Sequence, residues 1–281
     1  MSTQVSAAVT PVDAHAGVSD GLCGKSRYPL PAMVVSAIAA GFLIGLGFVF
    51  YTTAQLGADG LTYGVAKTLG GLVFSGALFT ITVLGLDLFT STTMDVLPVA
   101  EKKMTARRLV CHWGIVYLAN MLGAALLVAL MWLSGTMNYH HGEWGAVLTK
   151  AALAKLDHTW WEAFGLGIMC NLMVCLAVWV AGYARTVPDK LASVLFAIPL
   201  FVSTGFEHSV ANMFIIPMAL VGKWGGSADL MQALADTDLG ALTVMNYVGS
   251  NLIPVTLGNI VGGAMVAMTM YVLARGRQRP H

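Results

Sequence analysis

Long apolar segments alternate with short polar connections along most of this chain. Six segments are apolar enough to cross a membrane, at about residues 30–55, 65–84 with a continuation, 109–134, 160–183, 191–221 and 251–274. Two of these stretches carry a short polar turn near the middle, at residues 85–93 and 204–209. A continuous helix through either would be about 50 Å long, against a hydrocarbon core of about 30 Å. We therefore predict that the second and fifth transmembrane helices are broken.

A helix that breaks at membrane depth leaves backbone N–H and C=O groups unpaired, which hydrocarbon does not tolerate. Each break must therefore be buried in protein or line a polar cavity. Two such breaks in one chain indicate a permeation path across the membrane.

The composition agrees with a membrane protein and narrows its chemistry. Of the 281 residues, 57% are hydrophobic and 10% are charged, whereas a soluble domain carries about 25% charged residues. The net charge of +1 leaves no basic stripe for a nucleic acid. The four cysteines lack the spacing of a metal site or a redox pair. We expect no nucleic-acid partner, no metal and no cofactor.

Lysine and arginine are distributed unevenly between the two sides of a six-helix topology. Eleven of the fifteen fall on one side, which places both termini in the cytoplasm by the positive-inside rule. We predict a cytoplasmic N-terminal segment at residues 1–27, a six-helix transmembrane channel domain at 28–275 and a cytoplasmic tail at 276–281. The N-terminal segment has no signal-peptide core. It is either a disordered tail or a mobile plug at the pore mouth.

The two halves of the chain carry matching residues at matching positions. The pairs are Gly85 with Gly205, Asp87 with Glu207, and Asn120 with Asn259. Because each half has three crossings, the second half enters the membrane from the opposite side. We predict an all-α membrane protein in which six helices form an inverted repeat and the broken second and fifth helices face one another.

Polar side chains in the breaks are the candidates for chemistry. Asp87 and Glu207 fit a structural role, since a carboxylate at a helix interruption accepts backbone N–H bonds. His208 differs because imidazole changes charge near neutral pH, so it can meet an anion or hand it a proton. Thr90 and Ser91 offer hydroxyl donors in the matching break. Together with half-helix N-termini, these groups favour a small anion.

Bulky apolar side chains flank both breaks. They are Phe74, Leu78 and Phe89 around the first break, and Phe201 and Phe206 around the second. Such residues either pack the helices or form constrictions that exclude hydrated ions. Lys155, near the expected outer mouth, is either a solvated loop cation or an attractor for anions.

Four segments resemble a known family: residues 85–92, 171–179, 205–214 and 251–260. The most specific is the string Phe-Glu-His-Ser-x-Ala-Asn-Met that begins at Phe206. From about residue 28 to 274 the chain resembles the formate/nitrite transporter family, and within it the bacterial formate channels most of all.

This resemblance implies an aquaporin-like fold and a homopentamer with one pore per protomer in the bacterial inner membrane. It implies a central His208 with Thr90, an outer constriction of Phe74 and Phe201, an inner one of Leu78 and Phe89, polar contacts from Asn171 and Asn259, and Lys155 at the outer vestibule. It also implies that the N-terminal segment is a pH-responsive gate.

The predicted function is a channel or transporter for formate, with nitrite or hydrosulfide as the alternative, because the same pore suits any small weak-acid anion. At His208 the substrate either passes as the anion or takes a proton. A water or glycerol channel should show paired Asn-Pro-Ala turns, and these are absent. We expect no enzyme, since Asp87 and Glu207 lie in different halves and no His-Glu-x-x-His motif occurs.

Overall fold

The computed structural model describes residues 9–277, and every regular element in that range is helical. Five stretches of the described chain are long and apolar enough to cross a membrane. They are α2 (Leu30–Gln55), α3 (Tyr63–Leu84), α6 (Ala106–Leu133), α8 (Trp160–Ala181) and Asn246–Gly276, which joins a π-helical turn (Asn246–Leu252) to α12 (Ile253–Arg277). The shorter helices are α1 (Pro11–Lys25), α4 (Phe89–Thr92), α5 (Val96–Ala100), α7 (Glu143–Leu156), α9 (Val187–Ser203), α10 (Ser209–Gly225) and α11 (Ala228–Ala233). The prediction of an all-helical fold is confirmed.

Apolar side chains cover the outer surface of these helices. Leu133 is 79% exposed, Phe196 77% and Val35 66%. A soluble monomer rarely exposes so much contiguous apolar surface. In a membrane protein this surface is in contact with lipid or with neighbouring subunits.

Two short non-helical linkers separate consecutive helices at the positions of the polar turns. We call residues 85–88, between α3 and α4, the first linker, and residues 204–208, between α9 and α10, the second linker. Gly85 and Gly205 adopt positive φ angles of 68° and 74°, which glycine tolerates without a Cβ clash. In each linker the next N–H reaches back to the helix, from Leu86 to the Ile81 carbonyl and from Phe206 to the Phe201 carbonyl, both at 3.0 Å. Both helices therefore end in the same glycine-dependent manner.

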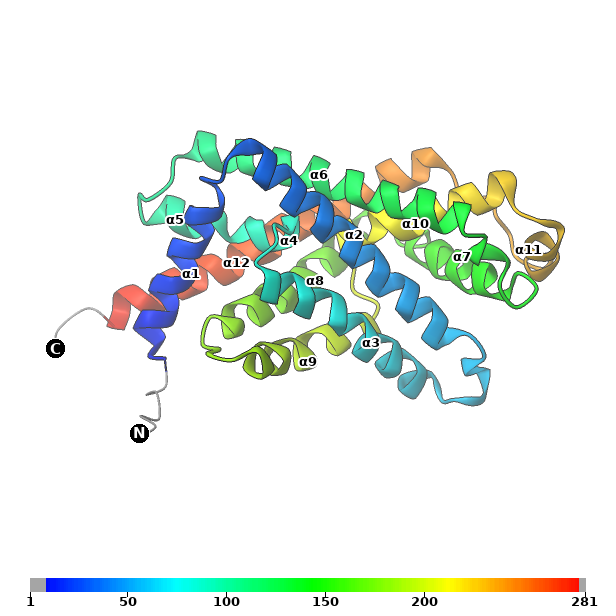
Figure 1. Cartoon of the computed structure of the whole chain (residues 1–281), viewed down its shortest axis with the longest axis horizontal. Helices are drawn as coiled ribbons and strands as arrows, with labels where there is room; N and C mark the ends of the chain where they lie inside the picture. The colour runs from blue at the N-terminus through cyan, green and yellow to red at the C-terminus, as the bar shows by residue number, and fades with distance from the viewer. Residues whose placement is uncertain (1–8, 278–281) are drawn as a thin grey trace.

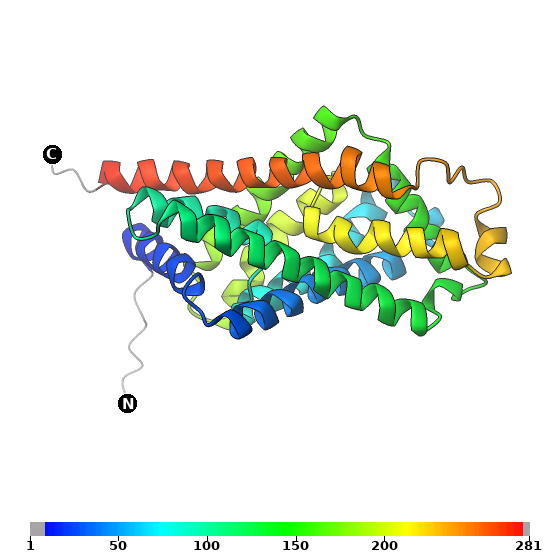
Figure 2. The same cartoon turned by 90° about the horizontal axis from the view of Figure 1, so that it is seen from above.

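The helices on either side of the second linker have different neighbours. α9 packs against α3 and α8, whereas α10 packs against α6, α7 and α2. Figure 1 shows α9 next to α3 and α8, and Figure 2 shows the yellow α10 alongside the green α6. Each has only 17 residues, which is shorter than a typical membrane-spanning helix. The chain thus changes direction and surroundings at the second linker.

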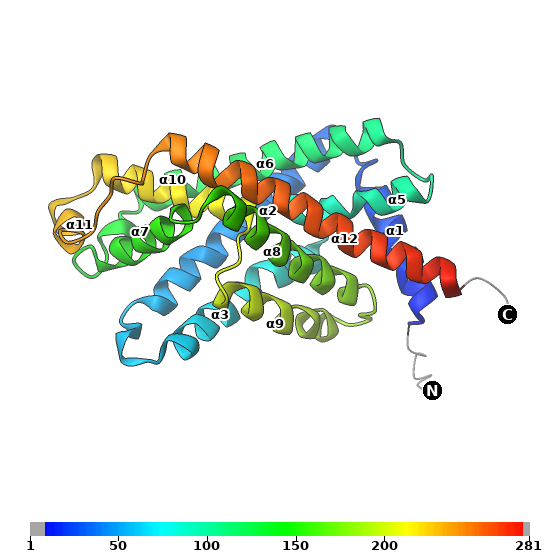
Figure 3. The same cartoon turned by 180° about the vertical axis from the view of Figure 1, so that it is seen from behind.

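Glycines let two pairs of helices touch at the backbone. A Cβ atom added at Gly123 of α6 would collide with the Ile38 carbonyl of α2, and one at Gly262 of α12 with the Ile168 carbonyl of α8. Small residues permit this close approach between membrane helices. Figure 3 shows the long α12 lying across α8. The two pairs occupy corresponding positions in the two halves of the chain.

The N-terminal segment differs from the expected disordered tail. Residues Pro11–Lys25 form α1, with Thr10 as its N-cap and with Leu22 and Cys23 buried. α1 packs against α5 and α12 at the end of the molecule where both described termini lie (Figure 1). The disordered-tail interpretation is therefore wrong for α1. The parts of the predicted segments at residues 1–8 and 278–281 lie outside the described residues.

The close contact at Gly123 predicts a stability difference within one helix. Gly123→Ala should lower the stability by about 1–3 kcal/mol or more, because the added methyl group pushes α6 away from α2. Gly114→Ala, on the same helix with open space around it, is the matched control. Thermal unfolding of both variants in detergent measures the effect. Equal melting temperatures would show that the backbone contact is unimportant.

Candidate functional site

Each linker is held by the side chain of its own buried asparagine. For the first linker this residue is Asn120 of α6. Its Oδ1 accepts a hydrogen bond from the Phe89 N–H at 2.8 Å, at the start of α4. Its Nδ2 donates to the Ala37 carbonyl at 2.7 Å and to the Asp87 carbonyl at 3.0 Å. A single buried side chain thereby satisfies backbone groups that the linker leaves without helical partners.

Asn259 of α12 repeats this arrangement in the other half. It accepts from the Ser209 N–H at 2.9 Å and donates to the carbonyls of Gly167 at 2.8 Å and Glu207 at 3.0 Å. Asn120 and Asn259 thus hold equivalent atoms of the two linkers. The family resemblance predicts a site role for Asn259 but not for Asn120. The only signal for Asn120 in the sequence is that its position in the first half matches that of Asn259 in the second.

His208 and Thr90 come together between the two linkers, although 118 positions separate them in the chain. The Thr90 Oγ1 and the His208 Nε2 are 3.1 Å apart, and both residues are buried. His208 Nδ1 accepts the Ala211 N–H at 3.2 Å. Because that nitrogen is an acceptor, the neutral ring carries its proton on Nε2 and donates it to the Thr90 oxygen. The Thr90 hydroxyl proton is then available to donate further.

Aromatic rings adjoin this pair on one side. Phe201 stacks on the His208 ring with centroids 6.1 Å apart, and Phe74 meets Phe201 edge-on at 5.9 Å. Leu78 and Phe89 are buried in the same hydrophobic cluster. Of these four apolar residues, Phe201 contacts the His208 ring directly and Phe74 contacts Phe201.

Asn171 of α8 binds the first half to the second. Its Nδ2 lies 3.1 Å from the Thr90 carbonyl, 2.9 Å from Thr93 Oγ1 and 2.5 Å from the Asn259 carbonyl. This amide fixes the backbone of the residue whose hydroxyl meets His208.

Lys155 is engaged in an ion pair rather than standing free at a mouth. Its Nζ donates to Glu207 Oε1 at 2.8 Å. The other oxygen of Glu207 accepts from Asn212 at 2.6 Å and from Asn251 at 3.2 Å. Lys155 and Glu207 line a pocket of about 300 Å³ together with Phe201 and His208. The pocket leads to the His208 side of the polar centre.

A second lysine faces the first linker, at a longer distance from its acid. Lys25, at the end of α1, donates to the Leu86 carbonyl at 2.7 Å and lies 3.7 Å from Asp87 Oδ1. This contact could not be predicted from the sequence, because 61 positions separate Lys25 from Leu86. Each linker acid therefore has a lysine partner from a peripheral helix.

Two other kinds of site find no support in the described residues. No group of three or more His, Cys, Asp or Glu side chains gathers within residues 9–277 as a metal site would require. The string Gly17-x-Ser19-x-Gly21 has the letters of a hydrolase nucleophile motif. That motif requires a strand-to-helix turn, whereas here it lies inside α1 with Ser19 bound to Glu101.

Comparison with known proteins identifies the family of this chain. The family profile described as formate/nitrite transporter matches residues 13–273. The chain belongs to the formate/nitrite transporter family. It is 42% identical over 263 residues to the formate channel FocA of Escherichia coli strain K12, covering 93% of this chain and 92% of that one. It is 40% identical over 262 residues to the formate channel FocA of Haemophilus influenzae, covering 92% of each.

A solved structure is similar as well. The pentameric formate channel with formate bound superimposes with a TM-score of 0.82 at 39% identity, covering 87% of this chain and 96% of that one. The resemblance inferred from the sequence motifs is confirmed. Members of this family are channels and transporters, which places the chain among membrane transport proteins.

The Lys155 ion pair predicts an asymmetric response to substitution. Lys155→Met should lower the stability by about 3 kcal/mol, because it leaves the buried Glu207 carboxylate without its cation. The double variant Lys155→Met/Glu207→Gln should regain more than half of that loss. Lys150→Met, at an exposed position of the same helix, is the control. Additive losses in the double variant, measured by thermal unfolding, would rule out the pairing.

Proposed function

We propose that this protein is a membrane channel or transporter for formate. The observation that carries the proposal is the His208–Thr90 pair, a buried hydrogen-bond donor system adjoined by the rings of Phe74 and Phe201. A carboxylate offers acceptor atoms to such donors, whereas a cation offers none. The likeness to formate channels, including one solved with formate bound, supports formate among the small weak-acid anions.

The path begins at the pocket next to Lys155. Lys67 and Lys155 both line it. Glu207 balances the charge of Lys155, so the positive charge of Lys67 raises the local concentration of a small anion. The anion then meets the apolar rings of Phe201 and Phe74, which slow hydrated ions. Beyond them the Thr90 hydroxyl donates a hydrogen bond to the carboxylate. Leu78 and Phe89 form the inner constriction.

His208 acts in its neutral form. Protonation of Nδ1 would break its bond to the Ala211 N–H and add a charge close to Lys155 and inside a buried site. The neutral ring cannot give its one proton to formate without becoming an imidazolate. We therefore assign His208 the role of orienting the Thr90 hydroxyl, and formate passes it as the anion.

We further infer that α3 with α4 and α5, and α9 with α10, are two broken crossings, which gives six membrane helices in an inverted, aquaporin-like repeat. The matching roles of Asn120 and Asn259, and of the two lysine pairs, support this symmetry. The excess of lysine and arginine at one end supports cytoplasmic termini. The similar solved structure is a pentamer, which supports a homopentamer. The relatives of this chain come from bacteria, which supports a location in the inner membrane.

Formate flux into proteoliposomes tests the function. The wild-type protein should carry formate far faster than glycerol, and parallel fluxes of nitrite and hydrosulfide rank the alternatives. Thr90→Val should reduce formate flux about 10- to 100-fold, because a hydrogen bond to a charged group contributes roughly 1.5–3 kcal/mol. Thr80→Val, where the lost hydroxyl bonds only its own helix, is the control. Equal formate and glycerol fluxes, or full flux in Thr90→Val, would contradict the proposal.

We propose that α1 is the pH-responsive gate that the family resemblance implies, and that contacts to Glu101 hold it in its docked position. Burial raises the pKa of the Glu101 carboxyl, but hydrogen bonds from Ser19, His15 and Lys103 outweigh it and bring that pKa below its usual value. Because the pKa is lowered in the docked state, ionised Glu101 stabilises the docking of α1 fully at any pH above the usual carboxyl pKa. This stabilisation is lost as the pH falls from that value through the lowered pKa.

Cys23 of α1 reports on this docking because it is 5% exposed. In a Cys111→Ser background, dithiodipyridine should label Cys23 slowly from about pH 8 to about pH 5. Glu101→Gln should label several-fold faster over that range, and the exposed Glu143→Gln at the other end of the molecule should not. Rapid wild-type labelling near neutral pH would show that groups other than Glu101 control α1.

A further inference from the structure

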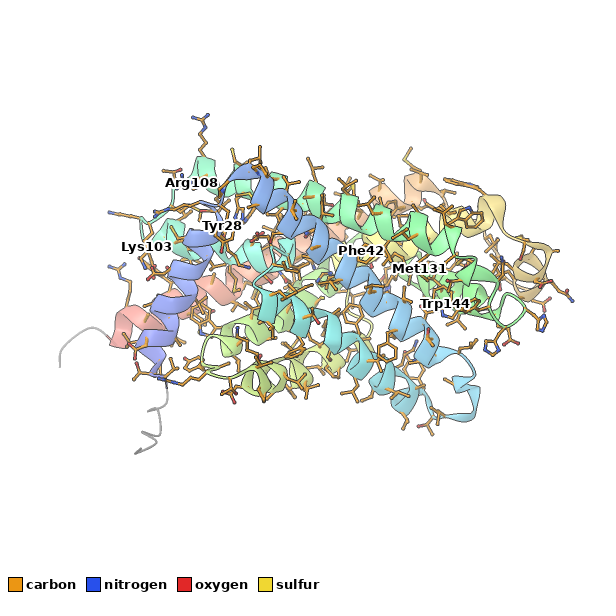
Figure 4. The ribbon with its side chains drawn as sticks, viewed as in Figure 1. Tyr28, Phe42, Lys103, Arg108, Met131 and Trp144 are labelled. Atoms are coloured by element: carbon orange, nitrogen blue, oxygen red, sulfur yellow. The ribbon has the colours of Figure 1, made fainter. Side chains whose placement is uncertain are left out.

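A second hollow lies at the end of the molecule that carries α1. It has a volume of about 540 Å³ and opens between the α1–α2 junction, the α5–α6 connection and the first turns of α6. Its cationic lining residues are Lys102, Lys103, Arg107 and Arg108, and no carboxylate lines it. Figure 4 shows Lys103 and Arg108 at this end, with Tyr28 near them. The hollow is separate from the pocket beside His208.

Most of the positive charge around this hollow is unpaired. Lys103 is bound to Asp20 at 2.8 Å and to Glu101 at 3.1 Å. Within residues 9–277, no carboxylate forms an ion pair with Lys102, Arg107 or Arg108. The N-terminus of α6, which begins at Ala106, adds its positive dipole end. The hollow therefore presents an anion site with no acid of its own to neutralise it.

A buried histidine in the wall supplies an independent sign of a ligand. His112 lines the hollow and is 2% exposed. Its Nδ1 lies 2.6 Å from Asp95 Oδ2, while its Nε2 has no hydrogen-bond partner among the described residues. Buried polar atoms are rarely left unpaired in native proteins. An anionic group in the hollow, directly or through a water, would provide the missing partner.

The hollow continues into apolar surface that faces the membrane. Met33 and Ile115 form part of its lining. On the same helix as Ile115, Val110 and Leu118 are each 65% exposed. An occupant that satisfies both regions has an anionic head and an apolar tail. Basic pockets at the cytoplasmic ends of membrane helices are suited to anionic lipid headgroups.

We propose that this hollow binds the phosphodiester headgroup of an anionic phospholipid, with Arg107 and Arg108 as the principal contacts. The acyl chains lie along the exposed face of α6. The site connects to the first half of the pore, since Asp95 belongs to the segment after α4 and the Trp113 Nε1 donates to the Thr92 carbonyl at 2.8 Å. A bound lipid therefore anchors the start of α6 against that segment.

Native mass spectrometry of the delipidated, full-length oligomer tests the site. The protein is titrated with phosphatidylglycerol and, separately, with phosphatidylcholine. The wild type should bind phosphatidylglycerol preferentially, and Arg107→Gln/Arg108→Gln should weaken that binding about 10- to 30-fold. Lys190→Gln/Arg275→Gln removes two cations that do not line the hollow and should bind as the wild type does.

Other results would overturn the proposal. One is an equal loss in both double variants, which would reflect net charge alone. Another is displacement of phosphatidylglycerol by millimolar inorganic phosphate, which would make the site one for free phosphate. Dissociation of the oligomer in Arg107→Gln/Arg108→Gln would make the hollow a subunit contact. None of these readouts depends on formate flux, so the lipid site and the proposed transport fail or stand separately.

Discussion

The structure depends on one constraint, namely that backbone polar groups inside an apolar interior must be paired. Two linkers interrupt the helices where the sequence places glycine and polar residues, and each would expose unpaired groups. Asn120 and Asn259 meet this requirement with the same three-bond pattern. Because both linkers are fixed in this way, the Thr90 hydroxyl and the His208 ring have defined positions. The polar centre is thus a consequence of how the two linkers are held.

The same requirement extends to charge. Asp87 and Glu207 are buried beside the linkers, and a buried carboxylate without a partner is strongly unfavourable. Lys25 of α1 and Lys155 of α7 provide the partners from helices at opposite ends of the molecule. An anion approaching either linker therefore meets a neutralised acid rather than a free one. Since Lys25 also belongs to α1, any movement of that helix removes charge compensation from the first linker.

Much of this arrangement could be predicted from the sequence, and the reasons differ by residue. The glycine and polar turns at residues 85–93 and 204–209 indicated the interruptions, because apolar runs longer than a bilayer cannot continue unbroken. The motif around His208 was specific enough to predict its meeting with Thr90. The Lys25 contact was not predictable, since no local pattern encodes a partner 61 positions away. The docking of α1 was not predictable either, because its weak amphipathic character does not indicate which face packs against α5 and α12.

The fixed orientation of His208 has a consequence for selectivity. With Nδ1 committed to the Ala211 N–H, the ring presents only a donor to Thr90, and the Thr90 hydroxyl in turn presents its proton outward. A permeating species must then accept hydrogen bonds at this point. Inorganic cations have no acceptor atoms and are also repelled by the net positive charge that Lys67 gives the pocket. Small oxyanions meet both conditions, and on the proposed path the phenylalanine rings limit their size and hydration. On the proposed path, selectivity therefore follows from the direction of one hydrogen-bond chain and not from a fixed positive charge at the centre.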